Sequence, residues 1–233
     1  MDVTSDEQVA AAVATVEAWV GGGRRRRLLC VVNNAGVGGG GYVDWYPMRS
    51  YERDAAVNYF GVIRVCKAFL PLLKSRARPL GRLGNPATSL APEAPPRILI
   101  VTSMAGKVPV PMLSSYVATK HAVTAFAACL RMELAESGVA LCTALPSFHK
   151  TPLLASGFSS LQRTWDELPA AVQAEYGEEC FATVVEACDS LLNDWAWDAK
   201  RVTEALTRAA TSVASSAVTF LSSRADSFSM GSN

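Results

Sequence analysis

The sequence has few of the side chains that metal sites need, with two histidines and six cysteines among 233 residues. Zinc sites use His and Cys ligands at short, regular spacings, whereas these cysteines form no paired-thiol motif and only His121 and His149 could join them. We therefore expect no metal site, and we interpret the cysteines as buried reduced thiols because most lie in apolar runs. They are Cys30, Cys66, Cys129, Cys142, Cys180 and Cys188.

An excess of one charge and a long apolar run are also missing. The chain has 22 basic and 21 acidic side chains, so its net charge of +1 gives no reason to expect nucleic acid or an anionic membrane as a partner. The run Arg24 to Arg27 is interpreted as a solvated turn. No window reaches about 18 uninterrupted apolar residues, and residues 1–7 are acidic and polar. We expect neither a transmembrane segment nor a signal peptide.

Half of the residues are hydrophobic, which suffices for one soluble globular domain. Continuous apolar runs, typical of strands buried on both faces, alternate with segments of helical periodicity. This rhythm predicts an α/β fold, a doubly wound parallel sheet flanked by helices. The predicted strands are residues 28–32, 97–103 and 139–145, and the predicted helices are a first one capped by Thr4 and Ser5, then 51–73, 115–137, 178–192 and 200–210. Residues 74–96, rich in Pro, Gly and Arg, are interpreted as a surface insertion.

In such sheets ligands bind at the carboxyl ends of the strands, so the loops beginning at Asn33, Ser103 and Pro146 should face one crevice. Tyr116 and Lys120 follow on one helix, and a spacing of four residues places both side chains on one face. A nearby ammonium favours ionisation of a phenol, so Tyr116 is a candidate general acid and base. The alternative is a surface pair.

Two further polar residues suit hydride chemistry. Ser103, at a strand end, could hydrogen-bond a substrate oxygen, although a strand-end cap is the simpler interpretation. Asn58 lies mid-helix, where its propensity is poor, and could hold a helix turn open for a proton-relay water. The alternative for Asn58 is a tolerated polar residue.

Together these residues resemble the classical short-chain dehydrogenase/reductases. The match covers nearly the whole chain through Thr151, apart from the insertion. The matching segments are Asp2-Val3-Thr4, Asn33-Asn34-Ala35-Gly36, Val57-Asn58-Tyr59-Phe60-Gly61, Ser103, Tyr116-Val117-Ala118-Thr119-Lys120 and Pro146-Ser147-Phe148-His149-Lys150-Thr151. The resemblance implies that residues 1–233 form a single, incomplete Rossmann-like domain, with a helical segment on the substrate side at about 152–212.

The resemblance also implies a role for each of these residues. Tyr116 would be the proton donor and acceptor, while Lys120 would lower the pKa of Tyr116 and hold the nicotinamide ribose. Ser103 would orient the substrate oxygen, and Asn58 would support the proton relay. The cofactor, NAD or NADP, would be contacted by Asp2 at the adenine, by Asn34, Ala35 and Gly36 along its central stretch, and by the segment from Pro146 to Thr151, whose threonine would meet the carboxamide.

The segment after Thr151, which contains Trp165, Tyr176-Gly177-Glu178-Glu179 and Ala205-Leu206-Thr207, resembles the branch that holds retinol, 17β-hydroxysteroid and 3-hydroxybutyrate dehydrogenases. This implies hydride transfer between NAD(P) and a small hydrophobic alcohol or its ketone or aldehyde, of steroid, retinoid or hydroxy-acid type. It also implies a homo-oligomer formed through the helices at 51–73 and 115–137, and an intracellular location such as the endoplasmic reticulum or mitochondrion. The alternative is a catalytically silent protein on the same scaffold that binds or regulates a complete homologue.

The sequence departs from the family in several features. Family members begin with a strand, a glycine-rich phosphate loop, a helix and a second strand, and none of these precedes Asp2. Gly36 to Gly41 follow a strand and are interpreted as a flexible loop, Ser147 replaces a glycine, and the end beyond Ala210 does not resemble the family's closing strand. We expect an N-terminally truncated chain in which the strand at 28–32 is an exposed edge. Such a chain alone should bind nicotinamide cofactor weakly or not at all in calorimetry.

Overall fold

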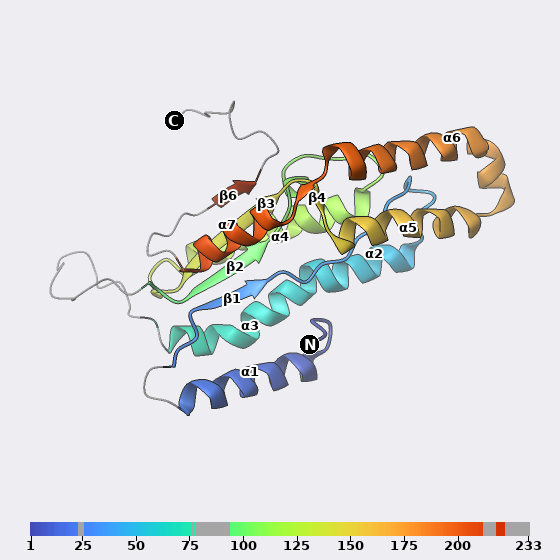
Figure 1. The fold of residues 1–233 in the computed structure, drawn as a ribbon. Helices are drawn as coiled ribbons and strands as arrows, with labels where there is room; N and C mark the ends of the chain where they lie inside the picture. The colour runs from blue at the N-terminus through green and yellow to red at the C-terminus, as the bar shows by residue number, and fades with distance from the viewer. Residues whose placement is uncertain (23–25, 76, 78–93, 212–217, 222–233) are drawn as a thin grey trace.

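The computed structural model describes residues 1–22, 26–75, 77, 94–211 and 218–221, and a four-stranded parallel sheet lies at its centre (Figure 1). Its strands are β1 (Cys30–Asn33), β2 (Arg97–Val101), β3 (Ala140–Pro146) and β6 (Val218–Leu221). They are ordered β1-β2-β3-β6, and every pairing is parallel. Parallel strands joined through helices confirm the predicted α/β fold.

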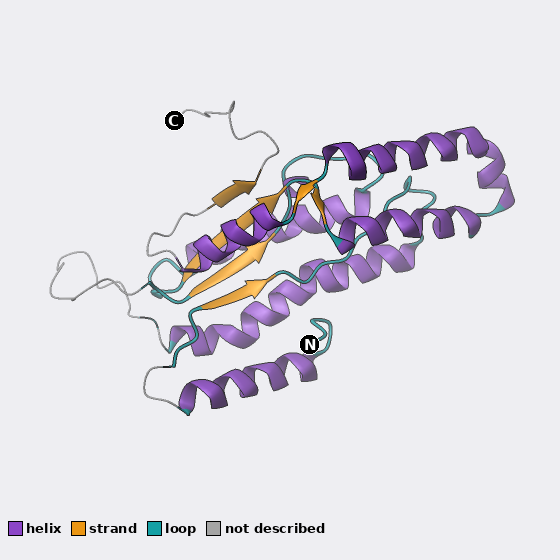
Figure 2. Ribbon diagram, viewed as in Figure 1, coloured by secondary structure: helices purple, strands orange, loops and turns teal. Residues whose placement is uncertain are grey.

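Helices cover both faces of this sheet (Figure 2). They are α1 (Asp6–Gly21), α2 (Met48–Ala55), α3 (Gly61–Lys74), α4 (Ser114–Glu133), α5 (Pro152–Asp166), α6 (Ala170–Ser190) and α7 (Lys200–Thr211). Side chains of α1, α3 and α4 form the main core with Ile98 and Ile100 of β2. Arg97 points to the opposite face, because neighbouring strand residues alternate, and donates a hydrogen bond of 2.6 Å to the carbonyl of Ala209 in α7.

β1 lies at the edge of the described sheet, as expected for the strand predicted at residues 28–32. Val31 packs into the core and is 8% exposed, whereas Val32 on the other face is 45% exposed. The expectation of a strand buried on both faces is therefore wrong at Val32, because α1, α3 and α4 pack on the face that Val31 enters and leave Val32 on the opposite face. An edge strand of this kind offers backbone hydrogen-bonding groups for further pairing.

The helix predicted at residues 51–73 extends from Met48 to Lys74 with one irregular turn. This turn, η1 (Ala56–Phe60), is π-helical and has Asn58 at its centre. By length and composition, the whole helix is long and apolar enough to cross a membrane. Its α3 part packs a stripe of buried side chains against the sheet, which is equally the behaviour of a core helix.

The segment after β3 is mainly helical, as predicted for residues 152–212. It also contains a short parallel pair, β4 (His149–Lys150) with β5 (Trp197–Asp198), and a π-helical turn, η3 (Leu191–Trp195). Helices α5 and α6 lie side by side beyond the sheet (Figure 1). Gly177, with φ 77°, interrupts α6, so the helical pattern in the sequence begins only at the next residue.

A closing strand is present, so the expectation for the part beyond Ala210 is wrong. β6 pairs in parallel with β3, with Val218 opposite Thr143 and Leu221 opposite Pro146. Four residues are too few for a periodic pattern, and pairing with a strand distant in the sequence defines this one. Of the predicted insertion at 74–96, residues 76 and 78–93 lie outside the described part of the chain.

The cysteines are all free. Cys66 and Cys142 are buried, but Cys129 is exposed, so the expectation of buried thiols is wrong for Cys129, which lies on the outer side of α4. Within the described ranges, no group of three or more His, Cys, Asp and Glu side chains is placed to hold a metal ion.

Candidate active site

The carboxyl ends of β2 and β3 bring two of the predicted loops together. Ser103 follows β2, and its hydroxyl donates a hydrogen bond of 3.4 Å to the carbonyl of Pro146 at the end of β3. The same hydroxyl accepts a hydrogen bond of 3.1 Å from the amide of Ala105, in the 3-10 turn η2 (Met104–Gly106). Ser103 thus caps a turn, as the simpler interpretation holds, and it also lines a cavity.

Tyr116 and Lys120 lie one turn apart near the start of α4. Lys120 is only 5% exposed, and its Nζ donates a hydrogen bond of 3.2 Å to the carbonyl of Val101. This Nζ lies 5.4 Å from the centre of the Tyr116 ring. The Ser103 hydroxyl lies within hydrogen-bonding reach of the Tyr116 phenol. The interpretation of Tyr116 and Lys120 as a surface pair is therefore wrong.

Burial dominates the titration of both groups. It raises the pKa of the Tyr116 phenol above its usual value, and the hydrogen bond with Ser103 offsets this only in part. Burial also lowers the pKa of Lys120 to about 8. The net pKa of Tyr116 therefore lies above its usual value and not below it as expected, because desolvation penalises the phenolate more than its neighbours, Lys120 included, stabilise it. At neutral pH the Tyr116 phenol is protonated.

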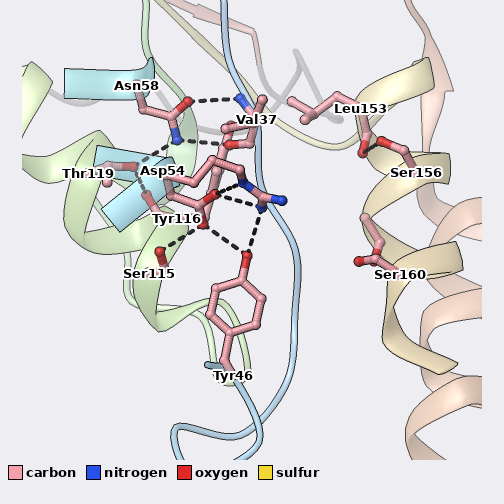
Figure 3. Close-up of polar contacts among 12 residues, drawn as sticks. Val37, Tyr46, Asp54, Asn58, Ser115, Tyr116, Thr119, Leu153, Ser156 and Ser160 are labelled. Atoms are coloured by element: carbon pink, nitrogen blue, oxygen red, sulfur yellow. Dashed lines mark hydrogen bonds and ion pairs between the residues drawn. The ribbon is translucent and has the colours of Figure 1, made fainter. Parts of the chain in front are cut away.

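Asn58 is 1% exposed and connects the loop after β1 to α4 (Figure 3). Its Oδ1 accepts a hydrogen bond of 2.9 Å from the amide of Val37, and its Nδ2 donates to the Val37 carbonyl at 2.8 Å. Nδ2 also donates to Oγ1 of Thr119 at 3.0 Å. A π-helical turn is wider than an α-helical one, so Asn58 lies in an opened turn, as we expect for a proton relay. The alternative of a merely tolerated polar residue does not account for these bonds.

A cavity of about 290 Å³ lies between these residues and the α5–α6 pair. Ser103 and Tyr116 line it, and most of the other lining side chains are apolar. Apolar walls with a few polar groups are typical of a site for a small organic ligand. The apolar residues include Met104, Val110, Leu154, Leu161, Val184 and Leu191.

Glycines of the loop after β1 form part of the cavity wall and pack closely on two tyrosine rings. A Cβ atom on Gly38 would lie 2.9 Å from Cδ2 of Tyr116, and one on Gly39 would lie 2.8 Å from the hydroxyl of Tyr46. Non-bonded carbon atoms do not approach other heavy atoms so closely, so only glycine permits this packing. The interpretation of Gly36 to Gly41 as a flexible loop is therefore wrong for its central residues.

The residues predicted to contact the cofactor's central stretch follow β1 directly. Asn34 and Ala35 are exposed and line a second cavity of about 170 Å³. Gly36 lies closer to the catalytic candidates, because a Cβ atom there would be 3.5 Å from Oδ1 of Asn58 and 3.7 Å from Nζ of Lys120. The structure thus brings Gly36 next to these two side chains, whereas Asn34 and Ala35 lie farther from them, at the second cavity.

Thr151 lies in the wall of the first cavity, and Pro146 lies beside Ser103. The hydroxyl of Thr151 caps α5 by accepting a hydrogen bond of 3.4 Å from the amide of Leu154. Pro146 contacts the site through its carbonyl oxygen, which accepts the hydrogen bond from Ser103. Both residues therefore lie beside the candidate catalytic serine or in its cavity.

Asp2 lies apart from the other predicted residues. Its carboxylate accepts hydrogen bonds of 2.8 Å from both the amide and the hydroxyl of Thr4, which lower the pKa of Asp2. Its neighbours Met1 and Val3 line the second cavity, whereas Asp2 itself does not. The structure does not bring Asp2 into either cavity.

The sequence reasoning missed three polar residues that surround the site. Thr119 accepts a hydrogen bond from Asn58, and Ser115 donates one of 2.8 Å to the fully buried Asp54. A signal was available, because Ser115 and Thr119 have the same four-residue spacing as the predicted catalytic pair and directly precede its members. Asp54 precedes Asn58 by four residues as well, so each of these two pairs lies on one face of its helix.

Comparisons with known proteins identify the family of the chain. A family model described as short chain dehydrogenase matches residues 1–161. Rat mitochondrial D-beta-hydroxybutyrate dehydrogenase is 32% identical over 178 residues, which cover 73% of this chain and 46% of the relative. Mouse estradiol 17-beta-dehydrogenase 2 is 36% identical over 133 residues, which cover 57% of this chain and 29% of the relative. The chain spans about half the length, or less, of these curated relatives.

Solved structures share the fold. A short chain dehydrogenase/reductase from Burkholderia phymatum in complex with NAD superposes with a TM-score of 0.66 at 23% identity, covering 94% of this chain and 68% of that one. NAD⁺-bound xylitol dehydrogenase gives a TM-score of 0.67 at 20% identity, covering 94% and 75%. Because the family model matches more than half of its residues, this chain belongs to the short-chain dehydrogenase/reductase family.

Proposed function

We propose that this chain acts in the NAD(P)-dependent interconversion of a hydrophobic alcohol and its ketone or aldehyde, with Asn58, Ser103, Tyr116 and Lys120 as the catalytic residues. One observation carries the proposal: Ser103 and Tyr116 line the same apolar cavity, and Lys120 is buried beside the Tyr116 ring. A scaffold without activity has no need of this convergence, and no observation of its own favours the silent alternative.

Proton transfer belongs to Tyr116. In the direction of reduction, the phenol donates its proton to the carbonyl oxygen, and its raised pKa keeps that proton in place at neutral pH. The Ser103 hydroxyl can turn from the Pro146 carbonyl to donate a hydrogen bond to the same substrate oxygen. In the direction of oxidation, Tyr116 accepts the proton, and the Lys120 ammonium stabilises the phenolate that precedes this step.

NAD or NADP would supply or accept the hydride at this site. The ammonium of Lys120 carries three N–H groups and donates one described hydrogen bond, to Val101, so it can also bind ribose hydroxyls. Gly36 has no side chain to block an approach to Lys120. The other contacts that we propose for the cofactor are Asn34 and Ala35 along its centre, Tyr116 at the ribose, the Pro146 to Thr151 segment at the carboxamide, and Asp2 at the adenine.

The apolar cavity favours a hydrophobic substrate of steroid, retinoid or hydroxy-acid type. The names of the relatives, a D-beta-hydroxybutyrate dehydrogenase and an estradiol dehydrogenase, support two of these classes. We further propose a homo-oligomer formed through α3 and α4, and an intracellular location in the mitochondrion or endoplasmic reticulum. The name of the rat relative supports the mitochondrion.

Turnover by the purified chain tests this proposal. Reduced cofactor, NADH or NADPH at high concentration, would be mixed with a panel of hydrophobic ketones and aldehydes, and its oxidation would be followed by absorbance. We expect carbonyl-dependent oxidation that falls about 10²–10⁴-fold in Tyr116→Phe. Tyr176→Phe is the matched control, because Tyr176 bonds Asp44 and does not line the cavity. Unchanged turnover in Tyr116→Phe would contradict the proposal, and so would an unaltered chain that binds the cofactor in calorimetry but turns over no carbonyl.

A further inference from the structure

Asp54 is a charged side chain that the proposed mechanism does not use, and it is 0% exposed. Its Oδ2 accepts hydrogen bonds from the hydroxyls of Tyr46 at 3.0 Å and Ser115 at 2.8 Å. Its Oδ1 accepts from the guanidinium of Arg53, with Nη2 at 2.9 Å. Removing a carboxylate from water is costly unless it is paired and hydrogen-bonded. The burial of Asp54 therefore depends on the hydrogen bonds from its three partners.

Asp54 and Asn58 form two equivalent connections between one helix and α4 (Figure 3). They lie one turn apart, and their partners Ser115 and Thr119 lie one turn apart on α4. In sequence Ser115 directly precedes Tyr116, just as Thr119 directly precedes Lys120. The Asn58 connection therefore holds the turn that carries Lys120, and the Asp54 connection holds the turn that carries Tyr116.

Asp54 also connects to Tyr116 through the glycine loop. The hydroxyl of Tyr46, which donates to Asp54, lies against Gly39, and the neighbouring Gly38 packs on the Tyr116 ring. The carboxylate thus contacts the residue before Tyr116 and the ring that supports the loop over Tyr116.

We propose that Asp54 is a positioning residue for Tyr116: through Ser115 and Tyr46 it fixes the tyrosine ring relative to Ser103 and the cavity. The importance of Asp54 for turnover rests on the proposed catalytic role of Tyr116. A carboxylate suits the task because its oxygens accept from several donors at once, whereas the amide of an asparagine would turn a donor towards one of those partners.

The position of Tyr116 can be measured without turnover. The six tyrosines would be labelled with ¹³C or ¹⁹F in the full chain, and the Tyr116 and Tyr46 signals would be assigned with Tyr116→Phe and Tyr46→Phe. The test variants are Asp54→Asn and Ser115→Ala. The matched control is Glu52→Gln, which removes an exposed carboxylate from the same helix.

We expect the Tyr116 signal to shift in both test variants and to stay unchanged in Glu52→Gln. In the turnover assay, Asp54→Asn should lower kcat by up to about 100-fold, as misplacement of a reacting group does, with the KM for cofactor little changed. A Tyr116 signal that stays fixed while that of Tyr46 moves would overturn the proposal, because the carboxylate would then hold Tyr46 alone.

Two further outcomes are decisive as well. If Asp54→Asn does not fold, the Tyr116 signal in Ser115→Ala decides the proposal in the same way. If Tyr116→Phe leaves turnover unchanged, the proposed function fails, but the signals still report whether Asp54 positions the ring. The two failures are therefore distinguishable.

Discussion

The cavity has two unlike walls, and Figure 3 shows side-chain hydrogen bonds between different elements on one of them. On the polar wall, Asn58 and Asp54 tie α4 to the preceding helix and to the loop after β1. On the α5 wall, Ser156 and Ser160 donate to carbonyls of their own helix, at 3.1 and 2.7 Å. Hydrogen bonds between elements hold the first wall, whereas packing holds most of the second, where Gln173 of α6 donates one hydrogen bond of 2.8 Å to the Trp165 carbonyl of α5.

Aromatic rings supply the packing of the α5–α6 wall. Trp165 of α5 stacks on Phe181 of α6 with ring centres 4.7 Å apart, and Trp45 meets the Trp165 ring edge-on at 4.9 Å. Packed apolar residues tolerate changes of shape better than a hydrogen-bond network tolerates the loss of a member. The comparison teaches that the polar wall is suited to the chemistry and the apolar wall to the choice of substrate.

The largest expected effect is on the stability of the apolar wall. Trp165→Ala should lower the free energy of unfolding by about 3–5 kcal/mol, because it removes a ring that is only 3% exposed and leaves a void. Chemical denaturation followed by circular dichroism measures this. Trp195→Ala is the matched control, since Trp195 is 69% exposed and should change stability by less than about 0.5 kcal/mol. Equal losses of unfolding free energy in the two variants would contradict the claim that the buried aromatic cluster holds the apolar wall.

A loss of rate is expected next, on the polar wall alone. Ser103→Ala should lower kcat by about 10²–10³-fold, because it removes a donor to the substrate oxygen at the moment when charge develops there. Ser156→Ala, on the opposite wall, removes a hydroxyl bonded to its own helix and should leave kcat within about twofold. Steady-state kinetics compares the two, and a large loss in Ser156→Ala would show that both walls take part in the chemistry.

Selectivity should change when the apolar wall is trimmed. Leu154→Ala enlarges the cavity and should shift the ratio of kcat/KM between a bulky and a small ketone by about 10-fold or more, the usual effect of apolar bulk in a pocket. Competition assays with paired substrates measure the ratio. Leu168→Ala alters the aromatic cluster without lining the cavity and should leave the ratio unchanged.

The smallest expected effect is a pH dependence of stability that comes from Lys120. Its folded pKa of about 8 lies below the usual 10.5, so between these values the unfolded state binds more protons and the contribution of Lys120 to stability rises with pH. Below pH 8 its buried charge destabilises the fold. Lys120→Met should therefore be more stable than the unaltered chain at pH 7, and this advantage should shrink by about 1 kcal/mol between pH 8 and 9.

Comparing the two chains at each pH cancels the buried thiols. Burial raises the pKa of Cys66 to about 12 and that of Cys30 to about 11. Above pH 9 these thiols lose protons more easily in the unfolded chain than in the folded one, so they lower the stability of the fold as the pH rises. They are common to both chains. An advantage of Lys120→Met that does not change with pH would contradict the burial of a titrating ammonium.

The polar wall could be predicted from the sequence because regular elements fix the directions of their side chains. A spacing of four residues places Tyr116 beside Lys120 on a helix, and the end of a parallel strand places Ser103 at the crevice. The raised pKa of Tyr116 and the link from Asp54 to Ser115 could not be predicted. The first comes from burial, and the second joins residues 61 positions apart in the chain, so no local pattern encodes either of them.

The apolar wall was less predictable for a related reason. Its helices follow from periodicity, but which apolar side chains face the cavity depends on the angle at which α5 and α6 pack, and the aromatic cluster unites Trp45 with rings more than 100 residues later. Likewise, the four residues of β6 become a strand only by pairing with β3. Elements defined by tertiary contacts leave little periodicity in the sequence.

A structure of the chain with reduced cofactor and an unreactive hydrophobic ketone tests the central claim most directly. We expect the ketone oxygen to lie about 2.6–3.2 Å from both the Tyr116 phenol oxygen and the Ser103 hydroxyl, inside the cavity between α4 and α5. A ketone bound elsewhere, or one whose oxygen contacts neither hydroxyl, would contradict the account.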